Sequence, residues 1–442
     1  MPEATYQFPD GFLWGTATAA HQVEGGNTNN NWHAWENEPG KIFNDQKFGL
    51  ACDWWGGRWQ EDLGNAAKDG QNAHRFSIEW SRIQPETDRW DDSALDFYRE
   101  MLKEMRKLGL TPIVTLHHFT DPLWIYEMGG WENEQTPEYF EKFVQKVVEA
   151  LKSEVKIWVT LNEPNGLVVN SYIDGCFPPG KKDFRAAFSA LTNLIRGHAL
   201  AYQAIHDIQP EAKVGYALYY RGFFPKRDWF PPDHWVTNML KRNFNDFFAN
   251  AIRDGFVKFM LFRTLVKEAI GTQDFIGLQY YSSDEISFNL LKPGELFSKR
   301  EYPKNAPLSP TGFIADVPQG MAQALKWAHQ FRLPIYITEN GVEDAEDKMR
   351  PAYLLRHLRE VWLAANFNWQ VKGYFHWTQV DNFEWERGWS QRFGLWGIDP
   401  QTQERTRRKS ADVYAAICKE NGISSESVRR LAPEVFHELF PG

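Results

Sequence analysis

Two glutamates each follow directly after an apolar segment of the chain. Glu163 comes after KIWVTLN and Glu339 after PIYIT. A carboxyl group at the end of a buried strand is a costly choice for solubility alone, so the repeated placement favours a chemical role. Cleavage of a glycosidic bond needs one carboxyl group that donates a proton and a second that attacks or activates water. The two residues therefore predict glycosidase chemistry, provided that the fold brings them into one cleft.

The composition of the chain narrows its class and its partners. The 442 residues include 20 Trp, 32 Phe and 16 Tyr, and aromatic rings serve both cores and sugar-binding clefts. The net charge of −9 argues against nucleic acid and anionic membranes as partners. The start of the chain shows no signal peptide, and no apolar run approaches the ~20 residues of a membrane span. With three widely spaced cysteines, which offer no disulfide framework, these features predict a cytoplasmic protein.

Short β-rich segments alternate with longer segments of helical periodicity, as expected for successive βα units. Eight strands are predicted, over residues 12–17, 73–80, 111–118, 156–162, 213–220, 275–281, 335–339 and 373–378. Helices are predicted after Ser93 and from Thr136, which would be an N-cap followed by Pro137. This alternation predicts an α/β fold with a parallel sheet.

Eight strands separated by helices predict a closed (β/α)8 TIM barrel, and an open doubly wound sheet is the weaker alternative. The absence of a GxGxxG motif after an early strand disfavours an open dinucleotide-binding sheet. Because no linker or repeat marks a boundary, residues 1–442 are predicted to form a single catalytic domain. The active site of such a barrel lies at the C-terminal ends of its strands. The fourth and seventh strands are three apart in a ring of eight, so Glu163 and Glu339 can face one mouth.

Several longer motifs resemble those of family 1 glycoside hydrolases, the β-glucosidase and β-galactosidase type. The motifs are TLNEP, YITENG, HRFSIEWSRI, FLWGTATAAHQVEG and DNFEWERGWSQRFG, which stand in the family's order between Phe12 and about Ser410. The resemblance implies a (β/α)8 barrel and a retaining exo-β-glycosidase, with a β-glucosidase as the favoured reading. It implies a β-linked oligosaccharide or an aryl or alkyl β-glycoside as substrate. No metal or organic cofactor is expected, since two carboxyl groups suffice for this chemistry.

The resemblance also implies the roles of individual residues. Glu163 would be the acid/base and Glu339 the nucleophile, with carboxyl groups about 5–5.5 Å apart, as retention requires. Once Glu339 is ionised, a second charge nearby is disfavoured, so Glu163 would stay protonated. Arg75 would keep Glu339 ionised, and Tyr281 would donate a hydrogen bond to it. The implied sugar-binding residues are Gln22, His118, Asn162, Trp377, Glu384 and Trp385.

The chain departs from the family pattern at three places. Gln279 stands where asparagine is usual, and its extra methylene is expected to disturb a hydrogen bond near Glu163. Asn165 replaces a tryptophan common in bacterial members, and Phe119-Thr120 replaces a pair that often ends in aspartate. These changes are expected to affect the preference for the leaving group more than the chemistry.

Two other functions compete with the leading one. A 6-phospho-β-glycosidase would need a cation near O6 of the sugar, where this chain has Glu384 and Trp385. A non-catalytic sugar-binding barrel keeps the fold without the chemistry. Both carboxyl groups, Arg75 and Tyr281 are present, which argues against it.

Some residues have simpler interpretations. His117 and His118 lack the spacing of a metal site, and His117 is expected to be a packing residue. The basic run ERTRRKS, residues 404–410, is expected to be a solvated face. The rim of the cleft is predicted to carry Trp32, Trp124 and Trp327. The sequence leaves the oligomeric state and the choice among glucose, galactose, fucose and mannose open.

Overall fold

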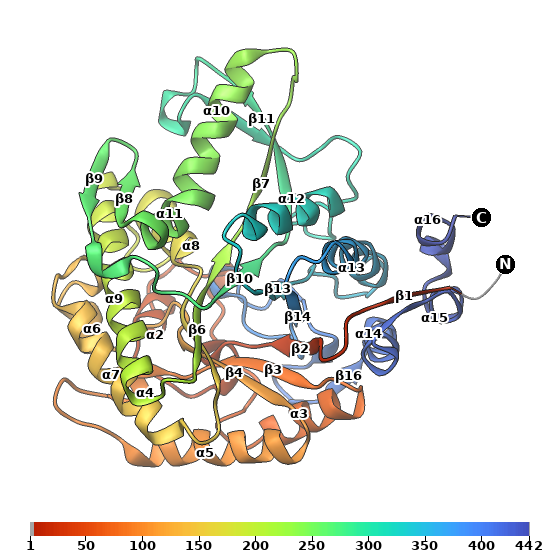
Figure 1. Cartoon of the computed structure of the whole chain (residues 1–442). Coiled ribbons are helices and arrows are strands. Elements are labelled where there is room, and N and C mark those ends of the chain that lie inside the picture. The colour runs from red at the N-terminus through yellow and green to blue at the C-terminus, as the bar shows by residue number, and fades with distance from the viewer. Residues whose placement is uncertain (1–3, 442) are drawn as a thin grey trace.

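The computed structural model, which describes residues 4–441, contains a closed barrel of eight parallel strands (Figure 1). The strands are β2 (Leu13–Ala17), β3 (Ala73–Ser77), β4 (Thr111–His117), β5 (Ile157–Asn162), β6 (Lys213–Tyr219), β10 (Phe275–Gln279), β13 (Ile335–Asn340) and β14 (Val371–Trp377). They pair in ring order, with β14 closing on β2 through Gly373 and Leu13. All eight predicted strands are thus confirmed, with ends that differ by a few residues.

Long helices follow the barrel strands and cover the outside of the barrel. They are α3 (Trp59–Lys68), α5 (Asp92–Lys107), α7 (Thr136–Leu151), α9 (Phe184–Ile208), α11 (Phe247–Asp254), α12 (Pro318–His329), α13 (Arg350–Asn366) and α14 (Lys409–Glu420). Their apolar faces are buried against the strands, as Phe140, Phe143 and Val147 of α7 illustrate. Thr136 is the first residue of α7 rather than its cap, and its hydroxyl donates to the carbonyl of Gly130. The predicted (β/α)8 barrel is confirmed.

The loops after the strands carry additional short elements. On the side of β2 to β5 these are α1 (Ala20–Glu24), α2 (Asn31–Glu36), α4 (Trp80–Ile83), α6 (Leu123–Glu127) and α8 (Pro164–Val169). After β6 and β10, a small sheet of β7 (Gly222–Pro225), β11 (Ser283–Phe288) and β12 (Ser298–Glu301) packs with α10 (Pro231–Lys241) and projects from the barrel (Figure 1). Because β7 and β11 directly extend barrel strands, this sheet forms one wall beside the mouth.

Other short strands form two-stranded sheets outside the barrel. They are β8 (Phe256–Phe259) with β9 (Phe262–Leu265), β15 (Trp396–Ile398) with β16 (Arg405–Arg407), and β1 (Thr5–Gln7) with β17 (Gly422–Ser424). The chain then ends with α15 (Ser425–Leu431) and α16 (Phe436–Leu439), close to its beginning (Figure 1). Within residues 4–441, none of the helices combines the length and the apolar character that crossing a membrane requires.

Candidate active site

A cavity of about 590 Å³ lies at the C-terminal ends of the barrel strands and contains both strand-end glutamates. Glu163 follows β5 and is half-buried, and Glu339 belongs to β13 and is buried; both line the cavity. The predicted residues that line it with them are His118, Asn162, Tyr281, Trp377, Glu384 and Trp385. The fold thus brings together side chains that are up to 267 positions apart, from residue 118 to residue 385.

Glu339 is surrounded by donors that stabilise its ionised form. Arg75, which is only 1% exposed, forms an ion pair with one carboxylate oxygen through Nη1. Tyr281 donates its hydroxyl to the other oxygen at 2.6 Å. Burial raises the pKa of Glu339, whereas the charge of Arg75 and the two hydrogen bonds lower it. Burial outweighs these contributions, so the pKa of Glu339 stays above its ordinary value, but its donors favour the anion here over the anion of Glu163.

Glu163 has the opposite environment. Burial raises the pKa of its carboxyl well above the ordinary value, and the charge of Glu339 adds to the rise. Arg75 opposes this rise only through its charge, since its hydrogen bonds go to other groups. Of the two carboxyl groups, Glu339 therefore ionises first and Glu163 keeps its proton.

Asn162 is held by a hydrogen-bond network that includes Gln279, one of the three departures from the family pattern. Arg75 donates to Asn162 Oδ1 at 2.6 Å, and Gln279 donates to the same oxygen at 2.7 Å. The amide nitrogen contacts Nε2 of His118 at 3.0 Å. The side chain of Gln279 therefore bonds Asn162, the residue directly before Glu163.

Two polar atoms near the cavity have no partner among the described residues. Burial lowers the pKa of His118 well below its ordinary value, and its Nδ1 is buried without a hydrogen bond. Gln22 lies behind the cavity wall, where its amide donates to Glu384 at 3.1 Å, and its own oxygen is unpartnered. A neutral imidazole with a free ring nitrogen suits a sugar hydroxyl.

Burial also changes the protonation state of Glu384. Its pKa is raised to about 8, mainly by burial and by the charge of Glu386. Near neutral pH this carboxyl is therefore mostly protonated and can donate as well as accept a hydrogen bond.

The aromatic residues divide into those that line the cavity and those that support it. The rings of Trp377 and Trp385 lie 6.0 and 5.8 Å from the ring of His118. Phe119, in a left-handed conformation with φ of 68°, packs against Trp385 at 5.1 Å. The prediction of a tryptophan rim was wrong, because the described cavity lining contains none of Trp32, Trp124 and Trp327. Their indole nitrogens instead bond protein oxygens of Phe119, Gln84 and Asp246.

The remaining departures have structural roles. Asn165 donates to the backbone carbonyls of Tyr219 and Phe244 at 2.7 and 3.2 Å. Thr120 donates to the buried Glu79 at 3.0 Å. His117 contacts Asp121 at 2.9 Å, as expected of a packing histidine. Asn165 therefore ties the loop of Glu163 to the end of β6.

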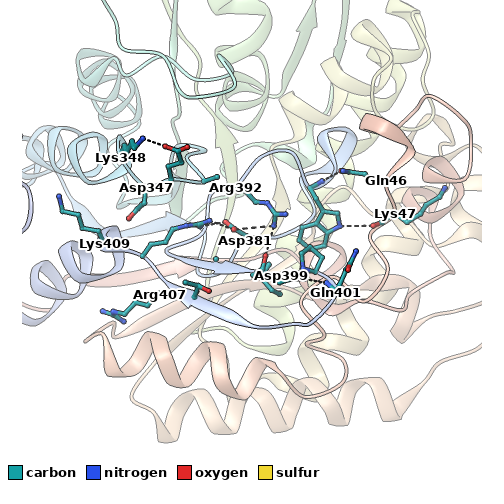
Figure 2. A pocket seen from close by; sticks show the side chains of 18 of the residues that line it. Gln46, Lys47, Asp347, Lys348, Asp381, Arg392, Asp399, Gln401, Arg407 and Lys409 are labelled. Carbon is teal, nitrogen blue, oxygen red and sulfur yellow. Dashed lines mark hydrogen bonds and ion pairs between the residues drawn. The ribbon is translucent and has the colours of Figure 1, made fainter.

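A larger surface cavity, of about 1410 Å³, lies elsewhere and contains neither glutamate. Figure 2 shows its charged side chains facing each other, with Asp381 at 3.9 Å from Arg392. Arg408 completes a two-bond pair with Asp381 at 2.7 and 2.8 Å. Because this cavity holds neither strand-end glutamate, it is not the place of the chemistry predicted for them.

Sequence reasoning missed the cavity residues on the side of β6, chiefly Tyr219, Arg221 and Asp284. The position of Tyr219 at the end of a predicted strand was the available signal, since the same rule found the two glutamates.

A protonated carboxyl group and a stabilised carboxylate in a cavity lined by aromatic rings are the arrangement that a glycosidase uses. Comparison with known proteins agrees: residues 4–423 match the family model "Glycosyl hydrolase family 1". The chain is 34% identical to β-glucosidase A of Thermotoga maritima, over 94% of this chain and 99% of the relative. It is 32% identical to the cytosolic β-glucosidase of Homo sapiens, over 95% of this chain and 99% of that protein.

Solved structures show the same relationship. A β-glycosidase from Pyrococcus horikoshii superposes with a TM-score of 0.90 at 34% identity, covering 97% of this chain and 98% of that chain. A β-glucosidase from Thermotoga maritima in complex with glucoimidazole superposes with a TM-score of 0.88 at 31% identity, covering 95% of this chain and 100% of that chain. This chain belongs to glycosyl hydrolase family 1. The predicted family, barrel and enzyme class, a hydrolase of O-glycosyl bonds, are confirmed.

Proposed function

We propose that this enzyme removes terminal β-D-glucosyl residues with retention, using Glu339 as nucleophile and Glu163 as acid/base. Its character as a β-glucosidase-type glycosidase follows from the family and from relatives that carry that name. The observation that carries the assignment of roles is the unequal environment of the two glutamates. Arg75 and Tyr281 donate to Glu339, while the half-buried Glu163 has no such donors among the described residues.

The reaction follows from these environments. Glu339 attacks the anomeric carbon while Glu163 gives its proton to the leaving oxygen, so a glycosyl ester forms and the leaving group departs neutral. Esterification removes the charge of Glu339, and the pKa of Glu163 then falls because the repulsion has gone. Glu163 can therefore take a proton from water, which attacks the anomeric carbon and frees the carboxylate of Glu339.

We assign the sugar-binding side of the cavity to His118, Asn162, Trp377, Glu384 and Trp385, with Gln22 behind Glu384. The free Nδ1 of His118 and the two indole rings support this assignment. As substrates we propose β-linked oligosaccharides and aryl or alkyl β-glucosides. The compartment we propose is the cytoplasm, which the free thiols of Cys52, Cys176 and Cys418 support.

The test of the residue roles compares the wild type with two variants on 4-nitrophenyl β-glucoside. Glu339→Gln should abolish turnover. Glu163→Ala should lose most activity and regain it with azide, giving the β-configured glucosyl azide. An α-configured azide would contradict retention, and turnover by Glu339→Gln equal to that of the wild type would exclude the nucleophile. Turnover restricted to a 6-phospho-β-glucoside would favour the phospho-specific alternative.

A further inference from the structure

Tyr219, at the end of β6, lines the cavity beside the acid/base loop and is fixed there by its backbone. Its N–H donates to Asn165 Oδ1 at 3.3 Å, and its carbonyl accepts from the amide of Asn165 at 2.7 Å. Glu163 donates its own backbone N–H to Ala217 of the same strand at 2.8 Å. The end of β6 and the loop that carries Glu163 are therefore locked together.

The hydroxyl of Tyr219 is oriented by an ion pair. Arg221 donates from Nη1 to Tyr219 Oη at 3.0 Å. The guanidinium is itself held by two bonds to Asp284, from Nε at 2.9 Å and from Nη2 at 2.6 Å. Arginine has no acceptor, so the phenol oxygen must be the acceptor in this contact.

The phenolic proton is therefore left for another partner. None of the residues 4–441 accepts a hydrogen bond from Tyr219. Burial raises its pKa, so the phenol keeps its proton, while the positive charge of Arg221 acts against this rise. A neutral phenol next to a fixed cation is a good hydrogen-bond donor.

The position of β6 in the ring decides what this donor can meet. β6 lies between β5 and β10, whereas the proposed sugar-binding residues, apart from Asn162 at the end of β5, follow or end β2, β4 and β14. Tyr219 thus stands across the cavity from most of these residues, beside the loop that carries Glu163. The proton of Glu163 goes to the leaving oxygen, so this side holds the leaving group.

We propose that Tyr219 determines specificity by donating a hydrogen bond to a hydroxyl of a sugar leaving group, and that Arg221 and Asp284 position it for this contact. The inference rests on the proposed function. It names as favoured substrates the β-glucosides whose leaving group is itself a sugar. A simple aryl glucoside has no sugar hydroxyl in its leaving group, so it lacks the acceptor of this hydrogen bond.

The test is Tyr219→Phe, which removes only the hydroxyl. We expect kcat/KM for cellobiose to fall about tenfold, as the loss of one hydrogen bond predicts. For 4-nitrophenyl β-glucoside, kcat/KM should stay within about twofold of the wild type. Tyr302→Phe is the matched control, because that tyrosine lines the same cavity but already donates its hydroxyl to the carbonyl of Phe313.

A second variant tests the positioning role of Arg221. Arg221→Met should reproduce the selective loss on cellobiose. In the double variant Tyr219→Phe/Arg221→Met, kcat/KM for cellobiose should fall no further than in the more affected single variant, because both changes break the same contact.

Equal losses on both substrates would assign Tyr219 a structural role and overturn the inference, as would unchanged kinetics on both. Failure of the proposed function is recognised separately, by a wild type that turns over neither substrate.

Discussion

Glu163 and Glu339 are chemically identical side chains that their neighbours make different. Two donors, Arg75 and Tyr281, bond the carboxylate of Glu339. Burial and the charge of Glu339 both raise the pKa of the half-buried Glu163. Burial and the placement of hydrogen-bond donors thus make one glutamate an acid and the other an anion.

Tyr281→Phe tests this difference at the nucleophile. The hydroxyl lowers the pKa of Glu339, so its removal raises that pKa. Because Glu339 must be ionised to attack, the acidic limb of the kcat/KM profile against pH should move to higher pH, by up to about one unit. The basic limb, which reports Glu163, should move less. An unmoved acidic limb would show that the hydroxyl does not stabilise the carboxylate.

At the scale of elements, the start of α8 is shaped around Glu163. Glu163 itself adopts a left-handed conformation, with φ of 41° and ψ of 54°, which costs a non-glycine residue about 1–2 kcal/mol. Pro164 is the first residue of α8, and Gly166 is the third. A β-carbon at Gly166 would lie 3.1 Å from Glu163 Oε2. Glycine at this helical position therefore leaves room for the acid.

Gly166→Ala should separate stability from activity. Alanine favours a helix over glycine by up to about 1 kcal/mol, so the free energy of unfolding should not fall unless the crowding costs more. The displaced carboxyl should lower kcat/KM on cellobiose about tenfold to a hundredfold. Gly64→Ala in α3, where a β-carbon meets no atom within 4 Å, is the control and should leave activity unchanged. Unchanged activity in Gly166→Ala would mean that Glu163 adjusts without loss.

The basic run 404–410 shows how an element can differ from its sequence pattern. It was predicted to be a solvated face, and this was wrong for Arg405 and Arg408. Arg405 bonds both carboxylate oxygens of Asp62 at 3.1 and 3.0 Å, and both side chains are 1% exposed. Arg408 bonds Asp381 in the same way. Arg405 therefore fastens β16 to α3, which lies 343 positions earlier in the sequence.

Arg405→Met should leave the Asp62 carboxylate buried and without its cation. We expect the free energy of unfolding to fall by about 3–5 kcal/mol. Arg89→Met breaks an exposed pair with Glu86, 62% and 66% exposed, and should cost less than about 1 kcal/mol. Unfolding in urea measures both, and equal small effects would show that the buried pair adds no stability.

At the scale of the whole molecule, buried acids link stability to pH. Burial raises the pKa of Glu24 from 4.5 to about 7, although Arg82 and Tyr98 bond it at 2.7 and 2.6 Å. The folded state thus binds a proton that the unfolded chain releases above about pH 4.5. Its contribution to stability is complete below that pH and is lost as the pH rises through 7.

The midpoint of thermal unfolding should therefore decrease between pH 5 and pH 8. Glu24→Gln keeps the shape of the side chain without its titration, so the decrease should be smaller in this variant. Thermal scans of both proteins across this range measure the difference. Parallel curves would mean that other groups, such as Glu384, account for the dependence.

The sequence by itself determined the barrel and the chemistry of its mouth. Strand periodicity located the eight strands, and the residue at the end of each strand must lie at the mouth, which placed Glu163, Glu339 and Tyr281. Only the tertiary structure decided which atoms meet there: Gln279 with Asn162, Arg221 with Tyr219, and Arg405 with Asp62. Strand positions follow from local patterns that repeat along the chain. Contacts between side chains depend instead on strand register and rotamers, which are fixed when distant segments pack together.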